Sequence, residues 1–336
     1  MARLSPTDQV LMGSRCGGQS GMLGVRILPA TRDTTISNWA LNHYVRTMFR
    51  LQSPFMRAAA EAGLQLKCQC GAPIDEFLLH PHSCMNSRPG RQIPHDALVW
   101  RLVSLFETLP GVYKIEREVV MPETAPKRTD IAFCLADGTR IYVDPTLISS
   151  ICKSNFEAAL RKPLAAEGVL EKGKARKMQE YPADLQNLIP LVVTILTTRI
   201  APTAGAAMDA LWMQSVKAMG TLGDFASLNG EALRRLTSKS THWRNAWRKV
   251  ATVCVVTAVA KNTLARVARR LELKGYGANS EFSALLWGTT CAPGQDRDSP
   301  DSLDTKRWTE SPYLEIPRVE GEYSGGATRC GLPHDV

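Results

Sequence analysis

Three cysteines and two histidines fall within the seventeen residues CQCGAPIDEFLLHPHSC (68–84). Thiolates and imidazoles are the ligands that zinc prefers, and four of them fill a tetrahedral site and leave no position open for catalysis. The spacing predicts a structural zinc ion bound by Cys68, Cys70, His80 and Cys84. Gly71 would permit the tight turn after the second cysteine. Two alternatives stay open: His82 as the fourth ligand, or reduced core cysteines beside surface histidines.

The length, the cysteine usage and the apolar runs predict a soluble intracellular protein. The chain has 336 residues, enough for one large or two ordinary domains, and nine cysteines, an odd number that fits a reducing compartment. Its longest apolar runs, LIPLVVTIL (188–196) and VATVCVVTAVA (250–260), are too short to span a bilayer, and no secretory signal opens the sequence. We therefore expect neither a membrane partner nor secretion.

Positive charge is concentrated before the C-terminal tail. The formal net charge is +9, and the residues from Cys291 onward carry five Lys or Arg against nine Asp or Glu, a net −4, which leaves residues 1–290 at +13. This surplus favours a polyanionic partner, most often nucleic acid. On charge alone, a basic protein that is merely soluble is the alternative.

Hydrophobic periodicity predicts an α/β core in the middle of the chain. Helical patterns cover residues 37–62, 94–109 and 165–181, and strand patterns cover 112–120, 130–136, 140–147 and 191–198. Pro94 is expected at the first helical position, Asp137-Gly138 is expected to turn a hairpin, and Gly168 and Gly173 count against the third helix. From residue 94 the elements follow the order helix, three strands, helix, strand.

Composition divides the chain into five parts. They are a Gly-rich loop with a helical segment (1–60), the cysteine and histidine knuckle (61–92), the α/β core (93–204), a basic helical region (205–290) and an acidic tail (291–336). The Gly-rich stretch GSRCGGQSGMLG lacks the lysine of a phosphate-binding loop. The tail has too few apolar residues to pack and is expected to be disordered.

Two aspartates lie at the open end of the predicted hairpin. Asp130 opens one strand and Asp144 closes the next, so both carboxylates are expected to share a divalent cation such as magnesium or manganese. Glu118 on the preceding strand would add a third oxygen. Lys177 and Tyr181 share one face of the following helix, from which a lysine can orient the attacking water or offset transition-state charge. The alternative is that the aspartates only flank a turn and the lysine lies on a solvated face.

A basic segment surrounds two tryptophans in the helical region after residue 205. The residues expected to bind phosphates are Arg234, Arg235, Lys239, Arg244, Arg248 and Lys249. Trp243 and Trp247 either pack in the core or stack on bases. Core packing is favoured for Trp247, and both interpretations stay open for Trp243.

In order and spacing, these motifs resemble the C-terminal region of non-LTR retrotransposons that carry a restriction-like endonuclease. The matching positions are Cys68, Cys70, His80 and Cys84 for a CCHC knuckle, then His95-Asp96, Lys127-Arg128-Thr129-Asp130-Ile131, Asp144 in YVDPT, Lys177 and Tyr181. The stretch YVRTMFRLQSPF (44–55) also looks like the segment that precedes the knuckle. The resemblance implies a PD-(D/E)xK nuclease core of the order αβββαβ, with Asp130 and Asp144 on the cation and His95 at the edge of the site.

The chain departs from the family pattern at three positions. Pro94 stands where the family has an arginine before His95, Thr129 replaces the proline before the first aspartate, and Thr194 stands where related sequences often have glutamate. The polymerase signature of such elements is absent from the sequence, so we expect a free-standing or truncated derivative. Loss of the arginine is expected to reduce activity.

Two functions follow from these features. The first is a DNA endonuclease that hydrolyses phosphodiester bonds, with a structural zinc ion and catalytic magnesium or manganese. The second is a nucleic-acid-binding protein on the same fold that has lost catalysis. DNA or RNA would be the partner in either case, and a reverse transcriptase would have to act in trans. The family and the charge imply a nuclear location, or otherwise a cytoplasmic one.

Overall fold

The structure, a computed structural model, describes residues 5–15, 36–84, 88–120, 128–161, 167–181, 187–220 and 230–272. These residues form a mixed α/β fold with a four-stranded mixed sheet and a separate Cys/His cluster. The acidic tail and most of the Gly-rich stretch, for which the sequence predicts disorder and a loop, lie outside the described residues.

The sheet has the strand order β1-β2-β3-β4. Its strands are β1 (Val112–Val120), β2 (Arg128–Leu135), β3 (Arg140–Ile148) and β4 (Leu188–Thr194). The first three pair antiparallel, and β4 joins β3 in parallel. Gly138 turns the predicted hairpin at φ +85°, a left-handed conformation that suits glycine. The register pairs Ile131 with Val143, so Asp130 and Asp144 come next to each other at the open end.

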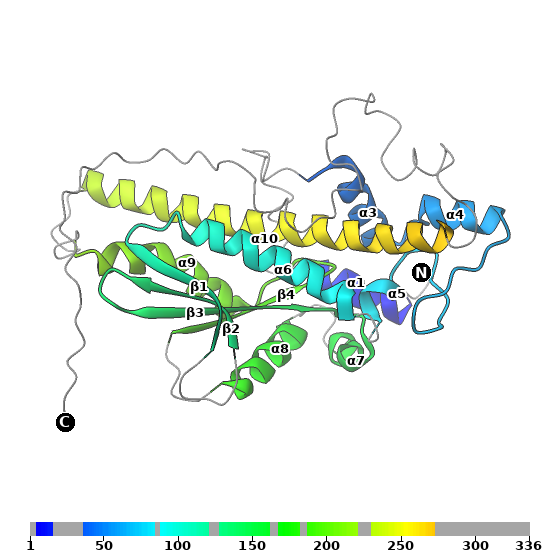
Figure 1. Ribbon diagram of the computed structural model, residues 1–336, viewed down its shortest axis with the longest axis horizontal. Helices are drawn as coiled ribbons and strands as arrows, with labels where there is room; N and C mark the ends of the chain where they lie inside the picture. The colour runs from blue at the N-terminus through cyan, green and yellow to red at the C-terminus, as the bar shows by residue number, and fades with distance from the viewer. Residues whose placement is uncertain are drawn as a thin grey trace. The chain divides into compact units, whose positions relative to one another are not determined.

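Helices cover both faces of this sheet (Figure 1). On one side lie α6 (Arg88–Phe106) and α10 (Gly230–Glu272), and on the other lie α7 (Lys153–Arg161) and α8 (Glu167–Glu180). The helix α9 (Pro202–Ala218) contacts both β4 and α10. The predicted apolar face of α6 is buried, and the rings of Phe106 and Phe133 pack with their centroids 4.9 Å apart.

Four helices precede α6 in the described part of the chain. They are α1 (Pro6–Arg15), α3 (Asn38–Phe49), α4 (Pro54–Glu61) and the short α5 (His80–Ser83). The predicted helical segment 37–62 is divided between α3 and α4, because Arg50 takes a left-handed conformation and Pro54 begins a new helix. Together α4 and the knuckle form a second apolar cluster with the end of α10.

Several predicted boundaries are wrong. The helix α6 begins at Arg88, so Pro94 lies inside the helix and does not start it. The strand β4 ends at Thr194 because the chain turns there: the Thr194 and Thr197 hydroxyls lie 2.6 Å apart, and Thr198 N–H donates to the Thr194 carbonyl. The helices α1 and α7 were not predicted, although Ser5 marks the start of α1 by accepting the Asp8 N–H at 3.2 Å.

The helix α10 is long and apolar enough to cross a membrane by length and composition, in the range Arg234–Val267. However, 72% of its apolar window is buried within the structure. Trp243 and Trp247 are both core residues: their indole N–H groups donate to the Met208 carbonyl at 2.7 Å and to Asp209 Oδ1 at 2.9 Å. We conclude that α10 packs as a core helix.

Replacing Trp247 tests this conclusion. Because Trp247 is fully buried, Trp247→Ala should lower the free energy of unfolding by about 3–5 kcal/mol. Urea denaturation followed by circular dichroism measures the loss. Trp100, which is 41% exposed, is the matched control, and Trp100→Ala should cost less than about 1 kcal/mol. Equal losses for the two variants would contradict the packing described.

Candidate functional site

The Cys/His cluster is assembled from the four residues that the sequence predicts. The ligand atoms of Cys68, Cys70, His80 and Cys84 all lie within 4.8 Å of one another. Cys68 Sγ and Cys84 Sγ are 3.6 Å apart, and Cys70 Sγ and His80 Nε2 are 3.2 Å apart. Sulfurs at about 2.3 Å from a zinc ion stand roughly 3.8 Å apart at the tetrahedral angle. The cluster can therefore hold a metal such as zinc.

Two local features position these ligands. Gly71 turns the chain after Cys70 at φ +85°, as predicted. The Asp75 carboxylate, which was not predicted, fixes the start of α5. It accepts the backbone N–H groups of Phe77, Leu79 and His80 at 3.0, 2.9 and 2.5 Å. An aspartate a few residues before a short helix is the signal that could have identified it.

His82, the alternative fourth ligand, does not belong to the cluster. Its side chain is buried, and its ring centroid lies 5.9 Å from that of His43 on α3. Burial lowers the pKa of His82 to about 4 and that of His43 to about 3, so both rings are neutral at neutral pH. His82 thus packs α5 against α3, and it is not a surface histidine.

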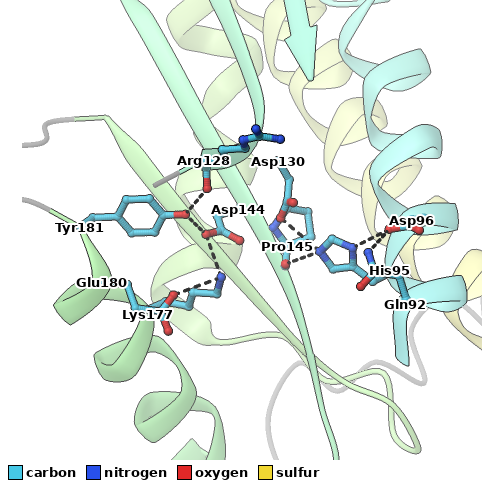
Figure 2. A network of polar contacts seen from close by, with 10 residues as sticks. All are labelled: Gln92, His95, Asp96, Arg128, Asp130, Asp144, Pro145, Lys177, Glu180 and Tyr181. Atoms are coloured by element: carbon cyan, nitrogen blue, oxygen red, sulfur yellow. Dashed lines mark hydrogen bonds and ion pairs between the residues drawn. The ribbon is translucent and has the colours of Figure 1, made fainter. Parts of the chain in front are cut away.

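A second group of polar residues gathers at the open end of the β2–β3 hairpin (Figure 2). Asp130 comes from β2, Asp144 from β3, His95 from α6, Lys177 from α8, and Tyr181 directly follows α8. Figure 2 shows the two aspartates between His95 on one side and Lys177 with Tyr181 on the other. The structure thus brings together five of the six residues predicted to be catalytic.

Asp144 is a buried carboxylate, 1% exposed. Its Oδ2 accepts a hydrogen bond from Lys177 Nζ at 3.0 Å and a short one from the Tyr181 hydroxyl. Its Oδ1 is also buried and has no hydrogen-bond donor in the described part of the chain. Burial raises the pKa of Asp144 to about 6, and the neighbouring charge of Asp130 adds to this rise although Lys177 opposes it. One oxygen of Asp144 is therefore left for a proton or a cation.

The donors to Asp144 keep their protons. Burial alone would lower the pKa of Lys177, but the Asp144 carboxylate raises it above its usual value. Burial and the same negative charge also raise the pKa of Tyr181 far above the usual phenol value. Lys177 is therefore a cation, and Tyr181 is a neutral donor.

His95 forms the other side of the site as a cation. Its Nδ1 lies 3.0 Å from Asp96 Oδ1, and its Nε2 lies 3.1 Å from both Asp130 Oδ2 and the Pro145 carbonyl oxygen. All three neighbours are acceptors, so both nitrogens must donate. Although burial opposes it, the two carboxylates raise the pKa of His95 to about 9. In return, and against the effect of burial, His95 lowers the pKa of Asp130.

Gly173 allows α8 to approach the sheet closely. A Cβ at this position would lie 3.0 Å from Val192 Cγ1 and 3.4 Å from Ile148 Cδ1. Gly173 and Lys177 stand four residues apart, so they share the helix face that meets the sheet. The glycine that counted against a helix in the sequence is thus the residue that lets Lys177 reach Asp144.

Glu118 does not join the site. Its side chain is 76% exposed on the edge strand β1 and lies 3.6 Å from the Arg128 guanidinium. The structure therefore does not bring the predicted third oxygen to the aspartates: β1 has a register shift between Tyr113 and Glu116, and Glu118 itself has φ +51°. Thr194 does not join either, since its hydroxyl is bonded within the turn after β4.

The residues predicted to bind phosphates divide into two groups. Arg234, Arg235, Lys239 and Arg244 are exposed along α10. Arg248 and Lys249 are not available to a phosphate: Arg248 forms an ion pair with Asp209 at 2.6 Å, with its side chain 13% exposed, and Lys249 is 3% exposed. The structure therefore does not place these two residues on the exposed basic surface of α10, because this part of the helix turns them toward the protein.

Comparison with protein-family models, with curated proteins and with solved structures found no match. The class of this protein is therefore defined by its own fold, its Cys/His cluster and the polar group at the end of the hairpin. It is a mixed α/β protein with a Cys3His group that can hold a metal and a partly buried carboxylate, lysine and tyrosine network at a strand end.

Paired histidine variants test the ligand set. His80→Gln should abolish stoichiometric zinc binding because it removes one of four ligands, whereas His82→Gln should retain zinc. Zinc content of purified, dialysed protein, measured by atomic emission, decides between them. Loss of zinc from His82→Gln together with full zinc in His80→Gln would show that the wrong histidine has been identified.

Proposed function

We propose that this chain is a divalent-metal-dependent endonuclease with a restriction-like PD-(D/E)xK core, related to the endonuclease region of non-LTR retrotransposons. The observation that carries the proposal is the convergence of Asp130, Asp144, Lys177 and His95 from four different elements on one point (Figure 2). Perturbed ionisable groups that meet in this way are typical of functional sites.

The order of the elements supports the proposed core. The helix α6 precedes β1, β2 and β3, and the helix α8 precedes the parallel strand β4. This is the αβββαβ order that the resemblance implies, with α7 as an additional helix. The two aspartates lie on the second and third strands, and the lysine lies on the helix before the fourth.

The carboxylates suit a divalent cation. Asp144 Oδ1 is buried without a donor in the described residues, and the nearby charge of Asp130 adds to the raised pKa of Asp144. Carboxylate oxygens are the ligands that magnesium and manganese prefer, so Asp130 and Asp144 would hold the cation. When bound there, the cation would polarise a phosphodiester and lower the pKa of an attacking water.

The other residues have roles that follow from their contacts. Tyr181 and Lys177 fix the orientation of Asp144, and the Lys177 cation would offset the charge that develops on the phosphate. His95 holds Asp130 in place as its ion-pair partner. The exposed basic residues of α10 would contact DNA phosphates, with RNA as the alternative substrate. Nuclear location and a reverse transcriptase in trans belong to the same proposal.

A second candidate is a nucleic-acid-binding protein that has lost catalysis. Two observations favour it: the last strand contributes Thr194, whose hydroxyl is occupied in a turn, and one Asp130 oxygen is already paired with His95. Such a protein would retain the knuckle and the exposed arginines of α10. It would bind DNA or RNA without cutting it.

Removal of the Asp144 charge separates these candidates. Wild-type protein should relax supercoiled plasmid in magnesium or manganese and not in chelator. Asp144→Asn should cut at least roughly 100-fold more slowly, because its amide cannot replace the carboxylate on the cation. Gel assays of nicking, with binding to the same plasmid measured in parallel, give both quantities.

Asp137→Asn is the matched control for this experiment. Asp137 lies in the exposed hairpin turn, where Asn-Gly turns the chain as well as Asp-Gly, so this variant should cut like the wild type. Binding without cutting by the wild type in either metal would reject the nuclease and leave the second candidate. If Asp144→Asn cuts as fast as the wild type, the proposal that Asp144 holds the catalytic cation is rejected.

The position of α8 provides an independent prediction. In Gly173→Ala the new methyl group meets the side chains of Val192 and Ile148, so either these side chains or α8 must give by a few tenths of an ångström. We expect α8 to move outward and to carry Lys177 with it. We expect cutting to slow by roughly 10-fold, since catalysis is sensitive to displacements well below 1 Å. The rate of plasmid nicking is again the measurement.

Gly168→Ala is the control for the same helix. A methyl group at Gly168 meets no atom of the described residues within 4 Å, so this variant should keep its rate and gain stability, by up to ~1 kcal/mol, through better helix propensity. A full rate in Gly173→Ala would show that close packing of α8 is unimportant for the site.

A further inference from the structure

The C-terminal part of α10 packs on the knuckle. Leu264 and Val267 are 7% and 0% exposed. They share an apolar cluster with Leu66, Ile74, Leu78 and Cys68 of the knuckle and with Phe55, Met56 and Ala59 of α4. Earlier residues of the same helix, as far as Val259, belong to the core over the sheet. In Figure 1 the orange end of α10 accordingly lies beside α4.

Arg266 lies between Leu264 and Val267 in the sequence and brings a positive charge to this end of α10. Its side chain is partly buried, and it interacts electrostatically with both Cys68 and Cys84. The positive charge of the same guanidinium adds to the effect of burial in lowering the pKa of His82 on α5. Burial lowers the pKa of Arg266, but the two cysteines oppose this effect, and an arginine stays charged at any physiological pH.

The charge of a filled cluster explains why a cation belongs there. Three thiolates and one neutral imidazole around a divalent zinc ion have a net charge of −1. Such a charge at a partly buried apolar interface is unfavourable unless a cation or hydrogen-bond donors compensate it. Arg266 is placed to compensate it from a segment remote in sequence from all four ligands.

We propose that Arg266 is an outer-shell residue of the Cys3His site, which stabilises the metal and thiolate charge and couples metal binding to the packing of α10 on the knuckle. The knuckle is then not an independent module. Its metal stabilises the end of α10, and α10 in turn sets the affinity for the metal. This inference does not depend on the proposed nuclease activity.

The zinc affinity of the full-length protein tests whether the charge of Arg266 stabilises the Cys3His site. Arg266→Met keeps an unbranched apolar stem and removes the guanidinium. Competition with a chromogenic chelator should show zinc binding weakened by roughly 10-fold or more, the usual effect of losing an outer-shell partner. Arg266→Lys should stay within about threefold of the wild type because it keeps the cation.

Arg270→Met is the matched control, because it removes the same charge one helical turn further along α10. Its zinc affinity should equal that of the wild type. An unchanged affinity in Arg266→Met, or an equal loss in Arg270→Met, would overturn the proposal. An equal loss in Arg266→Lys and Arg266→Met would show that packing matters and charge does not, which also overturns it.

Hydrogen exchange of the wild-type protein tests whether metal binding is coupled to the packing of α10 on the knuckle. This test uses no variant, so it remains valid even if Arg266→Met does not fold. Removal of zinc by chelator should speed exchange in residues 261–272 of α10 at least severalfold. Residues 243–259, which pack over the sheet, should change much less. Unchanged exchange at 261–272 would mean that the metal and α10 are not coupled.

Discussion

The burial of one long helix against three different partners is the constraint on which this arrangement depends. The helix α10 contributes Trp247 to the core over the sheet, Val256 to a cluster with α3, and Val267 to the cluster with the knuckle. An apolar helix of this length cannot be left in water, so its neighbours must lie along it. The sheet that carries the carboxylate network and the knuckle that carries the Cys/His cluster are thereby packed against one common helix.

A second constraint is the burial of the Asp144 charge. A protein in which apolar residues of similar volume replace a buried ion pair is often equally stable. The presence of such a pair is therefore weak evidence that its residues serve to stabilise the fold. In a structural pair, moreover, both oxygens are normally satisfied. Here Lys177 and Tyr181 both contact Oδ2, and Oδ1 has no donor among the described residues. This asymmetry leaves Oδ1 of Asp144 as an atom that a proton or a cation can reach.

Short-range signals in the sequence predicted the strands of the sheet and most of the residues that meet at the open end of the hairpin. Alternating strands around Asp137-Gly138 define the hairpin, and the hairpin alone brings Asp130 beside Asp144. Properties that depend on packing were not predictable in this way. The exposure of Glu118 follows from an irregular edge strand, the burial of Lys249 follows from how α10 meets its neighbours, and the value of Gly173 appears only once α8 lies on the sheet.

The charges of the network decide how a phosphate could approach it. The six ion-paired groups around the two strand-end aspartates are the cations His95 and Lys177 and the carboxylates Asp96, Asp130, Asp144 and Glu180, and together they have a net charge of −2 when all are ionised. A site of this sign attracts a divalent cation and repels a phosphodiester. Nucleic acid could therefore enter only after a cation, which makes metal dependence a necessary part of the nuclease proposal. A protein that only binds nucleic acid would instead rely on exposed cations that do not belong to this network, such as Lys239 on α10.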